Sequence, residues 1–202
     1  ANENLRNRQN AYHREYSRLE SLRNLTERYD GYGNSIRRVM EQKSREPKIL
    51  GVVADLIKVD KKYETAVEIA LGGSIQNIVT DNEQTAKRMI EFLKKNKFGR
   101  ATFLPLTQIR SHGGIAQPQA LNEAGVIGLA DTLVMVEDKY LELAGSLLGR
   151  TLVVDHIDHG LAIARKYRQS IRIVTLEGDL INPGGSMTGG AFKNSSNLLS
   201  RR

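Results

Sequence analysis

The 202-residue chain contains no cysteine and no tryptophan, and only 5% of its residues are aromatic. Without cysteine it can have neither a disulfide framework nor a thiolate metal site. No apolar run approaches the roughly 20 residues that cross a bilayer. The polar, charged N-terminus does not resemble a secretory signal. We therefore expect a soluble, cytoplasmic protein with one or two small domains.

The net charge of +7 is concentrated at the two ends of the chain. Residues 1–46 carry 10 basic and 7 acidic side chains, residues 47–192 carry 17 and 16, and residues 193–202 carry 3 and none. If both ends leave the body at one place, their charges combine into a basic patch that attracts phosphate backbones. The alternative is a solvated surface without a partner.

An internal repeat is the most informative feature of the sequence. Residues 54–63 lead into a helical pattern that ends at Gly72, and about 77 residues later residues 130–140 lead into one that ends at Gly149. In each copy a tyrosine precedes the glycine by nine residues. A fixed period indicates one supersecondary unit used twice. A pseudo-symmetric body of this kind suits a scaffold better than a single catalytic cleft.

Helical and strand patterns alternate along this body, which favours an α/β (α+β) layered fold. Residues 107–126 contain several glycines and a proline and are interpreted as a connector between the copies. Asp81 or Asn82 is expected to cap a helix whose inward residues are Ala86, Ile90 and Leu93. The predicted helices cover residues 63–71, 83–97, 139–148 and 157–167, and the predicted strands cover 75–80, 100–104, 132–136, 151–154, 171–175 and 180–181.

The N-terminal segment has the pattern of a long helix with a weak coiled-coil seam, because residues 3–30 contain no glycine or proline and Leu5, Tyr12, Leu19 and Thr26 are spaced by seven. Such a helix needs a partner to cover its apolar stripe. No segment of similar length exists at the C-terminus. We therefore expect the chain to be part of a longer protein, with the partner helix following Arg202.

Residues 182–190 form the densest glycine cluster. They do not fit a phosphate-binding loop, since no lysine follows Gly190 and the Gly-x-Gly-x-x-Gly pattern is absent. Two other roles remain: a plain turn, or a segment whose missing Cβ atoms let the backbones of two subunits approach closely.

Asp155, His156, Asp158 and His159 resemble a metal-binding cluster. His156 and His159 can share a helix face, but no third ligand is evident, and Asp155 is expected to cap the following helix. We predict no metal and no cofactor. No Ser/His/Asp set or carboxylate pair with catalytic spacing stands out, so we predict no enzymatic activity for this chain.

Two groups of basic residues are distinguishable. The cluster that ends the 83–97 helix is expected to be structural, because cations there favour the helix dipole. The residues that flank the body are better candidates for nucleic-acid contact, and the scarcity of aromatics favours phosphate contact over base stacking. These predicted DNA-binding residues are Arg37, Arg38, Lys43, Arg45, Lys193, Arg201 and Arg202.

Three segments carry a family resemblance. Residues 71–79, 99–106 and 175–190 resemble the first, second and third glycine motifs of the hinge of structural-maintenance-of-chromosomes (SMC) proteins. The sequence of these motifs is most similar to that of the bacterial branch. The resemblance covers about residues 47–192. It implies a hinge fold of two pseudo-repeated subdomains, with an N-terminal arm at 1–46, subdomain I at 47–112, subdomain II at 113–192 and the start of a C-terminal arm at 193–202.

The resemblance also implies a homodimer. The hinge of this family joins two arms of an antiparallel coiled coil, and it pairs with a second hinge where the glycines of the first and third motifs let edge strands meet. The interface residues that follow from this resemblance are Gly72, Gly73, Ile78, Gly149, Val153, Gly184, Gly185, Gly189 and Gly190.

The resemblance further implies a parent ATPase that compacts and segregates chromosomes with accessory condensin subunits in the nucleoid, and DNA binding without sequence specificity near the hinge–coil junction. This chain contains no Walker or ABC-type signature sequence, so we do not expect it to hydrolyse ATP. The alternatives are a nucleotide-binding α/β enzyme that uses the glycine-rich loop, and a structural dimerisation connector that does not bind DNA.

Overall fold

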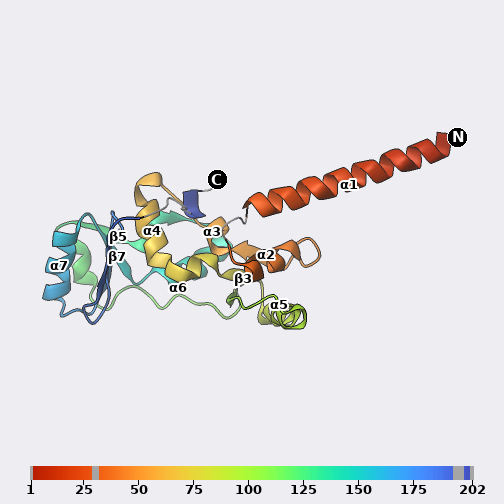
Figure 1. Ribbon diagram of the computed structural model, residues 1–202. Coiled ribbons are helices and arrows are strands. Elements are labelled where there is room, and N and C mark those ends of the chain that lie inside the picture. The colour runs from red at the N-terminus through yellow and green to blue at the C-terminus, as the bar shows by residue number, and fades with distance from the viewer. Residues whose placement is uncertain (1, 29–31, 193–197, 201–202) are drawn as a thin grey trace.

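The computed structural model describes the backbone of residues 2–28, 32–192 and 198–200, and the side chains of 2–20, 32–192 and 198–199. A long helix, α1 (Asn2–Arg28), projects from the body as a rod, and α2 (Asn34–Glu41) lies at the end of the body near it (Figure 1). The predicted N-terminal helix is therefore confirmed. None of the helices in the described residues is long and apolar enough to cross a membrane.

The first copy of the repeat forms a three-stranded sheet in the order β1-β3-β4. β1 runs antiparallel to β3, and β4 runs parallel to β3. The parallel pair requires a crossover connection, which α5 provides. The elements of this copy are β1 (Ile49–Val52), α3 (Val53–Leu56), β2 (Lys58–Val59), η1 (Lys61–Tyr63), α4 (Glu64–Leu71), η2 (Gly72–Gln76), β3 (Ile78–Thr80), α5 (Glu83–Asn96) and β4 (Phe103–Pro105).

The second copy forms a five-stranded sheet in the order β10-β9-β8-β7-β5. β5 is antiparallel to β7 and β7 is parallel to β8, as in the first copy, while β9 and β10 extend the sheet with antiparallel pairs. The elements are η3 (Pro118–Asn122), β5 (Val126–Leu129), η4 (Ala130–Leu133), β6 (Val134–Met135), η5 (Asp138–Tyr140), α6 (Leu141–Leu148), β7 (Thr151–Val154), α7 (Ile157–Lys166), β8 (Arg172–Thr175), β9 (Leu180–Ile181) and β10 (Met187–Thr188).

The two copies match in detail. β1 and β5 begin 77 residues apart, and in each strand the register shifts at a glycine with positive φ, Gly51 at 149° and Gly128 at 158°. A bulge of this kind bends a strand and increases its twist. β2 and β6, which occupy similar positions in the two copies, pair with each other. The structure thus confirms the repeat.

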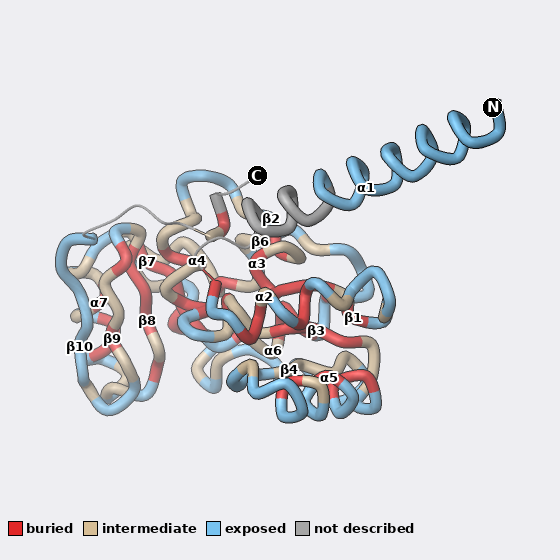
Figure 2. Tube along the Cα trace, turned by 45° about the vertical axis from the view of Figure 1, so that its right-hand side comes forward, coloured by how far each residue is buried: buried red, intermediate tan, exposed pale blue. Residues whose placement is uncertain are grey.

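The copies share one hydrophobic core. Val67 and Leu71 on α4 and Leu143 and Leu148 on α6 are buried in the same cluster. Figure 1 shows α4 and α6 in the middle of the body, and Figure 2 shows buried residues running through both sheets while the described part of α1 is exposed. The subdomain boundaries near residues 46, 112 and 192 stay predictions, because this core crosses from one copy to the other.

Several predicted elements are shifted or shortened. The predicted strand at 132–136 is a 3-10 turn, η4, followed by the two-residue β6, and β3 begins only at Ile78 because the 3-10 turn η2 occupies residues 72–76. β5 and β10 were not predicted. On α5, Ile90 is 40% exposed and Met89 is buried instead, because the buried face follows Ala86, Met89 and Leu93.

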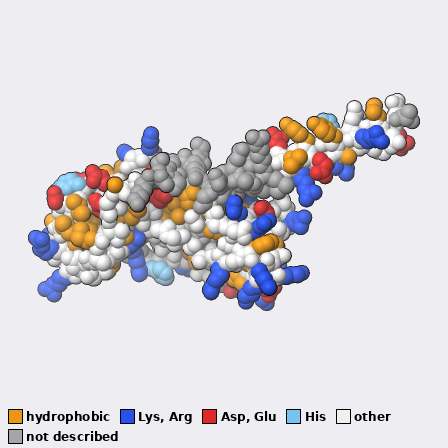
Figure 3. Space-filling view, in the orientation of Figure 1, with side chains coloured by type: hydrophobic (Ala, Val, Ile, Leu, Met, Phe, Trp, Pro, Cys, Tyr) orange, Lys and Arg blue, Asp and Glu red, His pale blue; other side chains and the backbone are white. Residues whose placement is uncertain are grey.

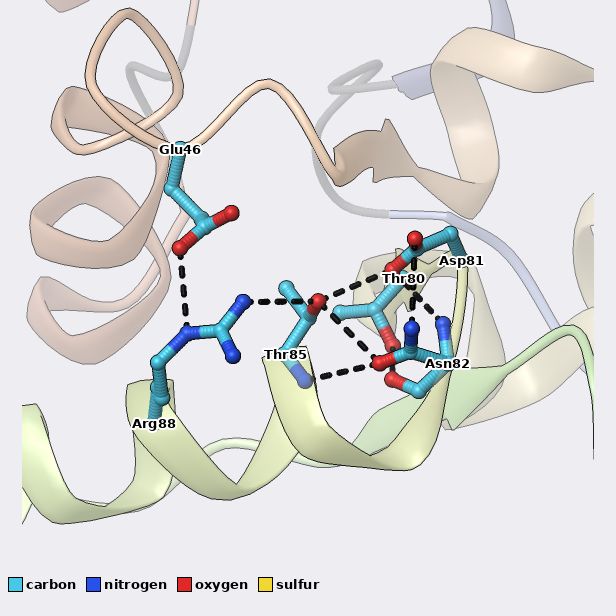
Figure 4. Close-up of polar contacts among 6 residues, drawn as sticks. All are labelled: Glu46, Thr80, Asp81, Asn82, Thr85 and Arg88. Carbon is cyan, nitrogen blue, oxygen red and sulfur yellow. Dashed lines mark hydrogen bonds and ion pairs between the residues drawn. The ribbon is translucent and has the colours of Figure 1, made fainter.

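Polar side chains fix the start of α5 (Figure 4). The Asn82 Oδ1 accepts the backbone N–H of Thr85 at 3.0 Å, and the Asp81 Oδ1 accepts the Thr85 hydroxyl at 2.8 Å. Asn82 is therefore the N-cap, one of the two predicted candidates. One turn later, Arg88 forms an ion pair with Glu46 at 3.1 Å between Nε and Oε2. This pair connects α5 to the segment that follows α2.

Candidate dimerisation and nucleic-acid interfaces

Five of the glycines predicted at the interface have open space around them. No described atom lies within 4 Å of the position that a Cβ would take at four of them, and at the fifth, Gly185, the nearest is a Gln169 atom at 3.9 Å. Their backbones are accessible to an approaching chain. The four are Gly72, Gly73, Gly184 and Gly190.

The backbone of the third-motif loop is fixed by its own hydrogen bonds. Gly184 and Gly185 have φ values of 90° and 100°, a conformation that favours glycine. The Gly184 N–H donates to the Gln169 carbonyl at 2.8 Å, and the Gly185 N–H donates to the Asn182 carbonyl at 3.0 Å. The Asn182 N–H in turn donates to the Ser186 carbonyl at 2.9 Å. The loop therefore presents a defined turn directly before β10.

β10 is an edge strand. Among the described strands it has a single neighbour, β9, and both of its residues, Met187 and Thr188, are exposed. The Met187 side chain is 49% exposed. An edge strand offers its backbone N–H and C=O groups to another chain. This strand was not predicted, because two residues are too short to show a strand pattern in the sequence.

The remaining four predicted interface residues make contacts within this chain, and their place at the interface stays a prediction. A Cβ on Gly149 would meet the Gly145 carbonyl oxygen, and one on Gly189 would meet the Asp179 carboxylate. Ile78 and Val153 are fully buried. They lie in β3 and β7, which have a strand on each side, so their side chains fill the core and do not flank an exposed edge.

Four of the predicted DNA-binding residues lie on α2 and in the turns after it. Arg38 pairs with Glu41 at 3.6 Å, and its guanidinium lies 4.7 Å from the centre of the Phe98 ring. The Lys43 Nζ donates to the Leu50 carbonyl at 3.1 Å, and Arg45 is exposed. Figure 3 shows Lys and Arg side chains gathered over the end of the body where Figure 1 places α2 and α5.

Arg37 differs from these three, since it is half-buried and its Nε has no hydrogen-bond partner among the described residues. The other three predicted DNA-binding residues, Lys193, Arg201 and Arg202, lie outside the described residues. The 3-10 turn η6 (Leu198–Ser200) lies on the side of the body from which α1 extends (Figures 1 and 2), and Leu199 is buried in the shared core. The two ends of the body therefore lie near one place.

The family model described as "SMC proteins Flexible Hinge Domain" matches residues 46–164. The chain belongs to the SMC hinge family. The predicted relationship to this family is thereby confirmed, and the match includes the first and second glycine motifs.

Curated relatives of this hinge are named chromosome partition protein Smc. The chain is 42% identical to the Desulfitobacterium hafniense protein over 190 residues, and 41% identical to the Bacillus subtilis protein over 185 residues. It is covered to 92% and 91% in these matches but spans only 16% of the length of each relative.

Solved hinge structures have the same fold. The hinge domain of Geobacillus stearothermophilus SMC, described as an asymmetric dimer, matches with a TM-score of 0.80 and 35% identity, covering 96% of this chain and 78% of that one. The hinge domain of the Pyrococcus furiosus SMC protein matches with a TM-score of 0.65 and 31% identity, covering 87% and 90%.

The hinge also brings Asp155, His156 and His159 together, with ligand-type atoms within 4.8 Å of one another. The Asp155 Oδ1 accepts the His156 backbone N–H and lies 2.7 Å from the His159 Nδ1, and the hydrogen bond with His159 lowers the pKa of Asp155. Asp155, which was expected to act as a helix cap, thus lies where a third ligand would be. The residue at the N-cap of α7 is His156, not the predicted Asp155.

The predicted heptad stripe lies on the solvent-exposed α1. Leu5, Tyr12 and Leu19 are 59%, 68% and 65% exposed, and Tyr16 stacks on Tyr12 with ring centres 6.3 Å apart. The side chain of Thr26, the fourth predicted member, lies outside the described residues.

Proposed function

We propose that this hinge forms a homodimer through its glycine motifs and the edge strand β10, as part of a chromosome-partition SMC ATPase. The observation that carries the proposal is the exposed edge of β10, bordered by open glycines at 184, 185 and 190. The relative from Geobacillus stearothermophilus is described as a dimer, which supports the same state for this chain.

Backbone pairing and apolar burial act together in this proposal. A strand added to β10 satisfies its outward N–H and C=O groups. The same contact covers Met187, and it can cover Phe192, which is 62% exposed beyond the strand. Burial of apolar surface contributes about 25 cal/mol per Å². Glycines beside the strand allow the two backbones to approach without steric conflict.

Gly73→Ala tests the proposed interface most sharply. Gly73 has a negative φ and no described atom within 4 Å of the position that a Cβ would take, so a methyl group there leaves the folded chain undisturbed. If a partner backbone approaches Gly73, the substitution weakens the dimer by at least tenfold. Sedimentation equilibrium over a range of protein concentrations measures the change.

Gly33→Ala is the matched control, since Gly33 also has negative φ and open space but lies beside α2. We expect it to dimerise as the wild type does. An unchanged dissociation constant for Gly73→Ala would remove the first motif from the interface, and a monomeric wild-type chain would refute dimerisation altogether. A Tyr12→Glu background separates hinge pairing from association through the α1 stripe.

We also propose DNA binding through phosphates near the junction of the hinge and its arms. The supporting observations are the four basic residues on and after α2 and the excess positive charge of both chain ends. Binding should weaken with salt by about 0.9 log unit per log unit of salt for each phosphate contacted. Salt-independent binding would contradict the proposal.

Arg45→Glu should weaken binding to random duplex DNA in fluorescence anisotropy and make the salt dependence shallower. Arg165→Glu, an exposed position on α7 at the far end of the body, changes the net charge equally and should have a smaller effect. Equal effects of the two variants would mean that net charge alone determines binding.

The parent protein's ATP hydrolysis, its accessory condensin subunits and its location at the cytoplasmic nucleoid are part of the same proposal. The hinge itself is proposed to have no enzymatic activity. The rival, a nucleotide-binding enzyme, predicts that ATP or NAD raises the melting temperature of this chain, because a ligand that binds only the native state stabilises it. We expect no shift with either nucleotide.

A further inference from the structure

The second copy contains a cleft of about 700 Å³. It lies between the connector at residues 112–117, the segment 146–151 that joins α6 to β7, the start of β8 at 170–172, and Pro183. Its volume is within the range of about 300–1,000 Å³ that is typical of small-molecule sites. Figure 1 shows the connector as an extended segment that passes α6 on its way toward α7.

The connector wall is held in place by hydrogen bonds. The backbone N–H of Ser111 donates to the Glu142 carboxylate at 2.6 Å, and the Gln117 side chain donates to the Ser170 hydroxyl at 3.2 Å. The connector also approaches Gly149 closely, with the Gly113 carbonyl 3.5 Å from the position of a Cβ there. The cleft is therefore a formed feature of the chain.

Two guanidinium groups line the cleft, and their hydrogen-bond acceptors are neutral. Arg172 donates to the Ala70 carbonyl and the Thr151 hydroxyl, both at 2.9 Å, and Arg150 donates to the His112 carbonyl at 3.2 Å. None of the described residues lining the cleft is Asp or Glu. Burial lowers the pKa of Arg172, which indicates that its charge is only partly solvated.

Such an arrangement favours an anion. A guanidinium group can donate two parallel hydrogen bonds to phosphate oxygens. The hydroxyls of Ser146 and Thr151 add further donors around the same cleft, whereas the Ser170 hydroxyl donates to the Tyr167 carbonyl at 2.6 Å. We propose that this cleft binds a phosphoryl group through Arg150 and Arg172, supplied either by a free phosphorylated small molecule or by a DNA backbone. The site is separate from the basic residues of α2.

Isothermal titration of the full chain with pyrophosphate, at constant ionic strength maintained with chloride, tests the site. We expect saturable binding that is at least tenfold weaker in Arg150→Glu and unchanged in Lys87→Glu, an exposed lysine on α5 in the other copy. Arg172→Lys keeps the positive charge but loses the two parallel donors of the guanidinium group, so it should also bind pyrophosphate more weakly. Thermal unfolding verifies that each variant is folded, and Arg150→Gln replaces Arg150→Glu if that variant is not.

Absence of saturable pyrophosphate binding in the wild type, or equal affinity in folded Arg150 and Lys87 variants, would overturn the proposal. Competition with labelled duplex DNA distinguishes the two sources. If pyrophosphate displaces DNA and Arg150→Glu weakens DNA binding, the phosphoryl group belongs to a nucleic acid. If Arg150→Glu loses pyrophosphate binding but still binds DNA as the wild type does, the ligand is a small phosphorylated molecule. Repeating the titration with Gly73→Ala separates this site from dimerisation.

Discussion

The two copies of the repeat use the same helix ending in opposite ways. In the first copy α4 ends at Gly72, which has a φ of 55° and no described atom near its potential Cβ. In the second copy α6 ends 77 residues later at Gly149, which has a φ of −70° and is covered by Gly113 of the connector. The same sequence position is therefore open in one copy and closed in the other, so the pseudo-symmetry does not extend to the ends of these two helices.

The copies also differ at the edges of their sheets. The first sheet stops at β4, whereas the second continues past the equivalent β8 with β9 and β10. The first copy packs α2 through Ile36, Val39 and Met40, which are buried in its own core cluster. The arm is thus attached through one copy, and the exposed glycine loop and edge belong to the other.

Paired core truncations should have the largest effect on this comparison. Leu71 and Leu148 are equivalent, 5% and 0% exposed, and belong to one cluster. Leu→Ala at either position should destabilise the chain by about 2–5 kcal/mol, because a buried leucine leaves a cavity. Urea unfolding should show a single transition for both variants. Separate transitions, with only one of them shifted, would show that the copies unfold as independent units.

Gly149→Ala should have the next largest effect. The new methyl group meets the Gly145 carbonyl, and such overpacking typically lowers the free energy of unfolding by about 1–3 kcal/mol. Gly73→Ala, with open space, should change the stability of the monomer by less than about 0.5 kcal/mol. Thermal unfolding at a concentration where the chain is monomeric compares them. Equal destabilisation by the two substitutions would mean that the C-terminal ends of α4 and α6 leave equally little room for a side chain.

Periodicity predicted the framework well because buried strands and helices impose local patterns. The repeat, α5 with its Asn82 cap, β7 and α7 all follow from such patterns. The two-residue strand β10 could not be predicted, since two residues carry no period, and β6 was predicted only as part of a longer strand. Their pairing depends on segments that are distant in sequence.

The candidate sites were predicted only in part, because they too depend on contacts between segments that are distant in sequence. The family resemblance pointed to the open glycines at 72, 73, 184, 185 and 190, but it could not distinguish them from Gly149 and Gly189, which are close to other parts of this chain. The apolar residues Ile78 and Val153 are suited equally to a core and to an interface. The pairing of Arg150 and Arg172 in one cleft depends on the fold alone.

Helix capping provides a smaller contrast. The side chain of Asn82 caps α5, but no side chain caps α7, where His156 occupies the equivalent place. Asn82→Ala should therefore cost about 1 kcal/mol. His156→Ala should cost no more than about 0.5 kcal/mol, the usual range for a surface substitution. Chemical denaturation at pH 7.5 compares the two. An equal loss in both variants would indicate that the His156 ring supports α7 by another contact.

Glu68→Gln should have the smallest effect, and its sign depends on pH. Glu68 has no counterpart in the second copy, where the equivalent residue is Gly145. Burial raises its pKa above the ordinary value of 4.5, nearby Glu64 adds to this shift, and a hydrogen bond from the Leu198 backbone partly offsets it. The folded chain thus binds this proton more tightly than the unfolded chain does.

The stability contribution of Glu68 therefore falls as the pH rises from the ordinary glutamate value through the raised one. Glutamine removes this ionisation and can still accept the Leu198 N–H. Because the side chain is only partly buried, we expect the variant to gain only a few tenths of a kcal/mol at pH 7.5. The gain should disappear at about pH 3, where the wild-type carboxyl is protonated in both states. Urea midpoints at the two pH values measure it, and a loss at pH 7.5 would show that the charged contact with Leu198 outweighs desolvation.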